Sequence, residues 1–153
     1  MAAESTSAPA WPAFQAARRR RVELLRAIQR FEAAVAAPAS EPGWRDRVHR
    51  RLAAVAEQLA EHVVVTEGPD GLYAELLEHA PRLDRPVAGL VAEHGALQRR
   101  VDALARWLGA PVPEEVERIR QRAGELLVAL SRHRQRGADL VYEAYATDIG
   151  GET

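Results

Sequence analysis

Residues 86–108, PVAGLVAEHGALQRRVDALARWL, indicate the fold class of this chain. Their large apolar side chains recur every three or four residues, so that on an α-helix they share one face. One histidine, His94, lies on the same face. The face consists of Val87, Leu90, His94, Leu97, Val101, Leu104 and Leu108. The stretch therefore predicts an amphipathic helix that buries a single strongly polar side chain.

Two other stretches repeat this pattern. Residues 44–66 predict a helix whose apolar face includes His62, and residues 113–146 predict a helix whose apolar face includes His133. The first face consists of Val48, Leu52, Val55, Leu59, His62 and Thr66, and the second of Val116, Ile119, Ala123, Leu126, Leu130, His133, Gly137 and Leu140. Three imidazole rings from three helices are therefore expected to point into one interior.

Prolines and glycines divide the rest of the chain. Residues 12–37 predict a further long helix that is closed by Pro38, and residues 72–80 predict a short helix that stops at Pro81. No stretch shows the alternation that is typical of a strand. We therefore predict an all-α fold, an up-down four-helix bundle with a short extra helix between the second and third long helices. Residues 1–10 are predicted to form a disordered N-terminus, and residues 11–153 the bundle domain.

Composition limits the functional classes. The 153 residues have a net charge of −1, which gives no general attraction to nucleic acid or to a membrane surface. The chain has no cysteine, which excludes disulfides, thiolate catalysis and cysteine-ligated metals. It has no apolar run long enough for a membrane span and no secretory signal, so we expect a cytoplasmic protein. Phosphate-binding loops, nucleophile motifs and dinucleotide fingerprints are also missing, so the sequence gives no support to an enzyme of the hydrolase or transferase type.

The three histidines need a partner in the interior. Burying an imidazole without a hydrogen bond costs about 1–3 kcal/mol, and a metal ion is one partner that three rings can share. The alternative is that each ring is an ordinary core histidine with its own hydrogen bond. If the third and fourth long helices are antiparallel, residue 128 lies opposite His94, and His133 is about 7.5 Å further along the axis.

Carboxylates near the histidines complete the candidate site. Glu67 follows His62 by five residues at the predicted end of a helix, and it is our preferred acidic ligand. On an ideal helix the two side chains are about 140° apart, so Glu67 reaches the site only if the helix end is distorted. Its alternative role is to cap the following turn. Glu93, Asp139 and Glu143 are weaker candidates, and Glu93 is expected to be a supporting partner of His94.

Three segments resemble a known family. The sequences EHVVVTE (61–67), EHGAL (93–97) and HRQRGADLVYEAY (133–145) are similar to those of a hemerythrin-like, HHE cation-binding domain of the actinobacterial type. The resemblance implies a four-helix bundle with non-haem iron, typically di-iron, that binds or senses dioxygen, nitric oxide or peroxide. Carried over by position, the metal ligands are His62, Glu67, His94 and His133.

The chain departs from the family pattern in its first helix, which has no histidine. Arg21 or Glu23 occupies the corresponding region. Gly137 and Ala138 also stand where a carboxylate is expected after the histidine of the last helix. The site is therefore expected to bind one metal ion, to bind two with substituted ligands, or to have lost metal binding. In the last case the protein is a metal-free helical bundle that serves as an interaction or regulatory module, with histidines bonded to carboxylates or to Tyr142.

Overall fold

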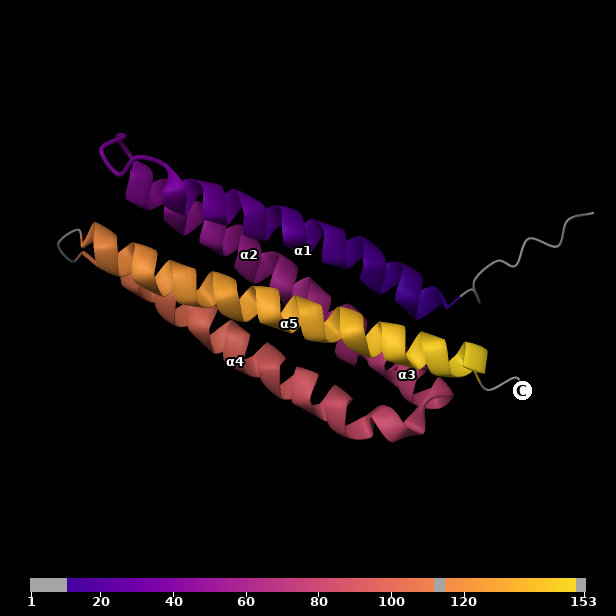
Figure 1. Cartoon of the computed structure of the whole chain (residues 1–153). Coiled ribbons are helices and arrows are strands. Elements are labelled where there is room, and N and C mark those ends of the chain that lie inside the picture. The colour runs from indigo at the N-terminus through magenta and orange to yellow at the C-terminus, as the bar shows by residue number, and fades with distance from the viewer. Residues whose placement is uncertain (1–10, 112–114, 151–153) are drawn as a thin grey trace, which may run out of the picture.

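The computed structural model describes residues 11–111 and 115–150, and within these ranges the chain is an all-α bundle with no strand (Figure 1). The elements are α1 (Pro12–Ala36), α2 (Trp44–Glu67), α3 (Leu72–His79), the 3₁₀ turn η1 (Pro81–Leu83), α4 (Asp84–Gly109) and α5 (Val116–Gly150). The predicted all-α class and the short extra helix are confirmed. The prediction of disorder for residues 1–10 falls outside the described residues.

Prolines set the ends of three of the long helices. The proline ring disfavours the helical region for the residue before it, so that residue usually adopts an extended backbone. The three residues that follow α1, α2 and α4 show this conformation, with ψ of 154°, 160° and 147°. They are Ala37, Gly68 and Ala110, which precede Pro38, Pro69 and Pro111. One helix end differs from expectation, because α5 continues to Gly150 rather than ending near residue 146.

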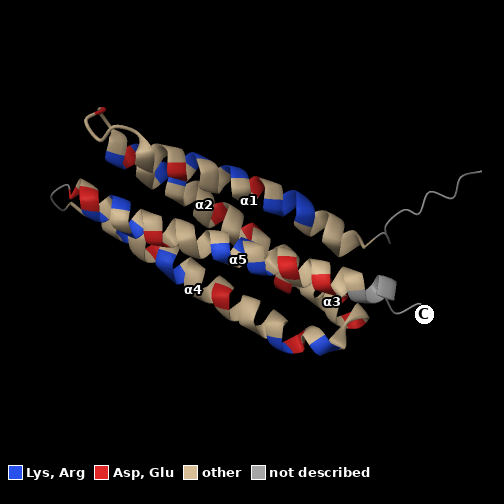
Figure 2. Cartoon of the chain, viewed as in Figure 1, with Lys and Arg blue, Asp and Glu red and all other residues tan. Residues whose placement is uncertain are grey.

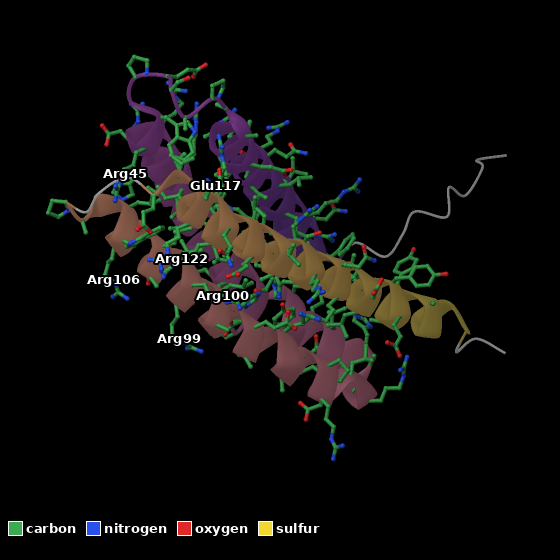
Figure 3. The ribbon with its side chains drawn as sticks, turned by 60° about the vertical axis from the view of Figure 1, so that its left-hand side comes forward. Arg45, Arg99, Arg100, Arg106, Glu117 and Arg122 are labelled. Atoms are coloured by element: carbon green, nitrogen blue, oxygen red, sulfur yellow. The ribbon has the colours of Figure 1, made fainter. Side chains whose placement is uncertain are left out.

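Contacts at one end of the bundle show the relative directions of the helices. The guanidinium of Arg45, at the start of α2, donates hydrogen bonds to the carbonyl oxygens of Trp107 and Leu108 at the end of α4, both at 3.1 Å. Arg45 is labelled at this end in Figure 3. In the same way Arg120, near the start of α5, donates to the carbonyl oxygen of Ala37 after α1 at 3.0 Å. Helix α2 is therefore antiparallel to α4, and α1 is antiparallel to α5.

The surfaces of the helices are mixed in charge. Figure 2 shows basic and acidic residues interspersed along each of the four long helices. None of the helices in the described part of the chain is both long and apolar enough to cross a membrane.

The apolar interior is divided into two clusters. One surrounds Phe31 and Leu52, toward the end where α1 meets α2, and the other surrounds Leu76 of α3 at the opposite end. In each long helix one polar residue interrupts the apolar face between the residues of the two clusters. These four residues are Arg21 in α1, His62 in α2, His94 in α4 and His133 in α5. We call this set the polar layer, and it is where the candidate site lies.

Candidate metal centre

The three histidines of the polar layer are buried and in mutual contact. Their exposed fractions are 7% for His62, 1% for His94 and 3% for His133. The ring centroids of His94 and His133 are 4.6 Å apart, and the His62 ring lies 5.0 Å from the first and 5.8 Å from the second. One nitrogen from each ring lies within 4.8 Å of one nitrogen of both others. The predicted convergence of the rings is confirmed, and the three side chains are close enough to bind one metal ion. We call them the histidine cluster.

Glutamates contact two of the three rings on the Nδ1 side. His94 Nδ1 lies 2.6 Å from Oε2 of Glu67, and His133 Nδ1 lies 3.1 Å from Oε1 of Glu93. A carboxylate accepts, so each ring donates its Nδ1–H and keeps its lone pair on Nε2. This is the arrangement in which a metal-binding histidine is usually found, with one nitrogen on the metal and the other donating to a carboxylate.

Glu67 reaches the site from the last residue of α2. The helix ends there because Gly68 and Pro69 follow, and the side chain extends to His94 of α4. The group of mutually close ligand atoms found among the described residues contains the three histidines and not Glu67. The structure therefore brings all four predicted residues together but places the Glu67 carboxylate against Nδ1 of His94.

Glu93 also lies at the site, but with a different partner from the one expected. Its carboxylate accepts from His133 of α5 rather than supporting the adjacent His94. The exposed Arg136 donates to the same oxygen at 2.7 Å and fixes the carboxylate in place. Of the weaker acidic candidates, Asp139 accepts from Gln135 and Glu143 from Arg82, both on the exposed surface.

His62 is the unsatisfied member of the cluster. Both of its ring nitrogens are buried, and neither has a hydrogen-bond partner among the described residues. The nearby hydroxyl of Thr66 is already used, because it donates to the His62 carbonyl oxygen at 2.8 Å. An uncompensated buried ring costs about 1–3 kcal/mol, so the position of His62 calls for a partner that the described part of the chain does not supply.

Tyr73 of α3 lies at the site, although the sequence analysis did not single it out. Its ring stacks on His94 with an interplanar angle of 14°, and its hydroxyl oxygen lies 3.4 Å from Nε2. This distance is long for a hydrogen bond from a hydroxyl, so the Nε2 lone pair stays available to a stronger partner. The tyrosines considered from the sequence lie elsewhere: Tyr142 is 76% exposed, and Tyr145 packs on Trp11. The expectation that Tyr142 bonds a buried histidine is therefore wrong.

The histidine cluster is neutral at physiological pH. Burial, followed by the neighbouring charges of His94, His133 and Arg21, lowers the pKa of His62 to about 3. Burial, followed by the charge of His133, lowers the pKa of His94 to about 4. Burial also lowers the pKa of His133, although Glu93 opposes the shift. Neutral imidazole is the form that binds metal ions, so no proton has to leave before a metal enters.

The two glutamates differ in their electrostatics. Burial raises the pKa of Glu67. Burial alone would also raise the pKa of Glu93, but the hydrogen bonds from Arg136 and His133 outweigh it, so that the pKa is lowered. Glu93 is therefore the more firmly ionised of the two carboxylates.

A small cavity adjoins the cluster, with a volume of about 20 Å³. Arg21 of α1 lines it and is half-buried. The other lining residues are Leu24, His62, Thr66, Leu72, Tyr73, His133, Arg134, Gly137 and Val141.

Comparisons of this chain with protein-family models, with curated proteins and with solved structures give no match. The resemblance to hemerythrin-like domains therefore stays a prediction from the sequence. What the structure establishes is a helical bundle with three buried histidines close enough to form a metal site.

Proposed function

We propose that this protein binds one divalent transition-metal ion, iron, through His62, His94 and His133. The observation that carries the proposal is the pair of unsatisfied, buried nitrogens on His62, next to two rings whose Nδ1 atoms contact carboxylates. Imidazole nitrogen is a ligand type that suits iron, zinc, copper and nickel. Iron is preferred here because of the resemblance of the three histidine-containing segments to hemerythrin-like domains.

The number of ligand atoms favours a single ion. The cluster offers three nitrogens, and Glu67 and Glu93 contact the opposite side of two of the rings. A second ion would need further ligands on the first helix, where Arg21 lines the cavity. Three nitrogens leave coordination positions open for a small ligand.

Iron in such a site supplies redox chemistry and an open position for dioxygen, nitric oxide or a peroxide. The chain's own residues would orient the rings and limit access of water. Glu67 and Glu93 fix two rings, and the side chains of Leu24, Leu72 and Val141 line the adjoining cavity. We propose that the protein binds or senses such a ligand.

The metal-free alternative explains only part of the geometry. Carboxylates satisfy His94 and His133 without a metal, as a simple scaffold would require. His62 has no such partner among the described residues, and its burial without one would destabilise a metal-free bundle. This difference makes metal binding our first choice.

Metal titration of the purified, metal-stripped protein tests the proposal. We expect one iron(II) ion per chain under anaerobic conditions, and a tetrahedral or five-coordinate absorption spectrum with cobalt(II). Replacing any histidine of the cluster by alanine should lower the affinity by more than the roughly 10–100-fold that loss of a supporting residue causes. The matched control is His49→Ala, which removes a histidine near Gly109 at the other end of the bundle.

Unfolding experiments supply a second readout. Metal at 100 times its dissociation constant should raise the free energy of unfolding by about 2.7 kcal/mol, because it binds the folded state alone. The His62→Ala variant should lose this increase while keeping its helical circular dichroism. If the wild-type protein takes up no metal and its stability does not respond to iron, zinc or cobalt, the metal-free bundle is the correct description.

A further inference from the structure

The cavity beside the histidine cluster is sized for a very small ligand. Its volume of about 20 Å³ compares with the roughly 10–15 Å³ that one water molecule needs. It reaches the cluster at His62 and His133, which both line it. His62 is more than nine-tenths buried and has two nitrogens without a partner among the described residues. A ligand in this cavity would therefore lie next to the unsatisfied ring.

The charged groups that line the cavity are all basic. Arg21 comes from α1 and Arg134 from α5, both are half-buried, and no carboxylate is among the lining residues. Within the described part of the chain, neither guanidinium has a hydrogen bond or an ion pair to an acidic side chain. The nearby glutamates do not compensate them, because Glu67 and Glu93 contact the Nδ1 side of His94 and His133.

A metal ion at the cluster would add positive charge to this region. Its ligands are neutral imidazoles, so the cation would repel Arg21 and Arg134 through a partly water-excluded space, where charges are poorly screened. A carboxylate ligand would normally reduce such a charge. No carboxylate is among the described residues that line the cavity, so an anion that enters the cavity would supply negative charge there.

We propose that the cavity binds a small monovalent anion of two or three heavy atoms, and that the anion and the metal ion bind together. Arg21 and Arg134 attract the anion on one side, and the metal at the histidine cluster attracts it on the other. The inference rests on the proposed metal site and adds that Arg21 makes the affinity for metal dependent on an anion. Coupling of this kind is reciprocal, so each partner raises the affinity for the other by the same factor.

Azide is a suitable probe, because it is linear, monovalent and three atoms long. Cobalt(II) affinity is measured on the full chain with and without azide at constant ionic strength, and azide affinity is measured with and without cobalt(II). We expect azide to tighten cobalt binding by about 5–150-fold, the usual range for coupled sites, with the same factor in the reverse direction. Sulfate, which is divalent and bulkier than azide, should have a smaller effect.

Variants of Arg21 separate this coupling from simple binding of azide to the metal. Arg21→Leu should bind cobalt with a clearly weaker dependence on azide, because only the metal and Arg134 then attract the anion, and Arg21→Lys should retain more of the dependence. The matched control is Arg19→Leu, which removes the same charge from the exposed surface of α1, away from the cavity. It should show the full coupling, and circular dichroism and urea unfolding of each variant confirm that it is folded.

The outcomes distinguish the two proposals. If cobalt binds but azide does not change its affinity, or if Arg21→Leu keeps the full coupling, the anion site is wrong and the metal site stands. If no metal binds with or without azide, both proposals are overturned.

Discussion

At the scale of single residues, the two glutamates behind the rings are the most informative feature. Glu67 and Glu93 come from different helices, yet each accepts from the Nδ1 of one histidine in the cluster. The same local chemistry therefore occurs twice in one site. Carboxylates in this position fix the tautomer and orientation of a ligand ring and increase its basicity.

Removing the charge of either carboxylate should weaken metal binding without removing a ligand. We expect Glu67→Gln and Glu93→Gln each to lower the affinity for cobalt(II) by about 10–100-fold, because the amide is a weaker acceptor for the ring N–H. Isothermal titration calorimetry or absorption titration measures the effect. The control is Glu57→Gln, an exposed residue on α2. Unchanged affinity in both site variants would show that the glutamates serve stability alone.

The partner of Glu93 could not be predicted from the sequence. Glu93 and His94 are adjacent, so on a helix their side chains diverge by about 100°. That divergence points Glu93 toward α5, where it meets His133 and Arg136. The prediction that Glu93 supports a histidine of the site was right, but it named the wrong histidine. Only the packing of α4 against α5 determines which ring Glu93 meets.

At the scale of elements, α3 is a short helix that completes the bundle beside the site. Leu76 is fully buried in the second apolar cluster, and Tyr73, one turn earlier, stacks on His94. A helix of eight residues has little stability of its own, so its position depends on this packing. Trp11 supports the same region by stacking on His79, with ring centroids 4.5 Å apart.

Truncation of Leu76 tests the role of α3. Leu76→Ala should lower the free energy of unfolding by about 2–5 kcal/mol, the usual cost of a cavity at a fully buried leucine. Urea unfolding followed by circular dichroism measures this change. Val64→Ala, at a side chain that is 66% exposed, should change stability by less than about 0.5 kcal/mol. Equal effects of the two substitutions would mean that α3 contributes no more than the surface does.

At the scale of the whole molecule, the polar layer separates two apolar clusters, and its burial links protonation to folding. The pKa values of His62 and His94 are lowered by burial to about 3 and about 4 in the folded protein, whereas an imidazole in the unfolded chain titrates near 6.5. Between these values the unfolded chain binds more protons than the folded protein. The free energy of unfolding therefore falls as the pH falls below about 6.5.

This linkage gives a pH prediction for the metal-free protein. Each of the two histidines should decrease the free energy of unfolding by about 1.4 kcal/mol for every pH unit between its unfolded and folded pKa. Urea unfolding at pH 7, 6 and 5 measures the slope. His62→Leu should reduce the slope by about the share of one histidine, because leucine does not titrate. Stability that is independent of pH over this range would mean that the rings are not buried in the neutral form.

The sequence by itself determined the elements and the buried faces. The apolar spacing around His62, His94 and His133 identified three helices and the side of each that faces the interior, because helical periodicity is a local property of the chain. Prolines and glycines likewise determined where most of the helices end. These signals depend only on neighbouring residues, and they were enough to predict an all-α bundle with converging imidazoles.

Only the tertiary structure decided which residues share a level along the bundle. Counting residues from the connection placed His133 about 7.5 Å along the axis from His94, whereas their rings are in contact with centroids 4.6 Å apart. The pairings of Glu67 with His94, Glu93 with His133 and Arg21 with the cavity depend in the same way on how far each helix is shifted and tilted. That shift is set by how whole faces pack against each other, so no local pattern in the sequence contains it.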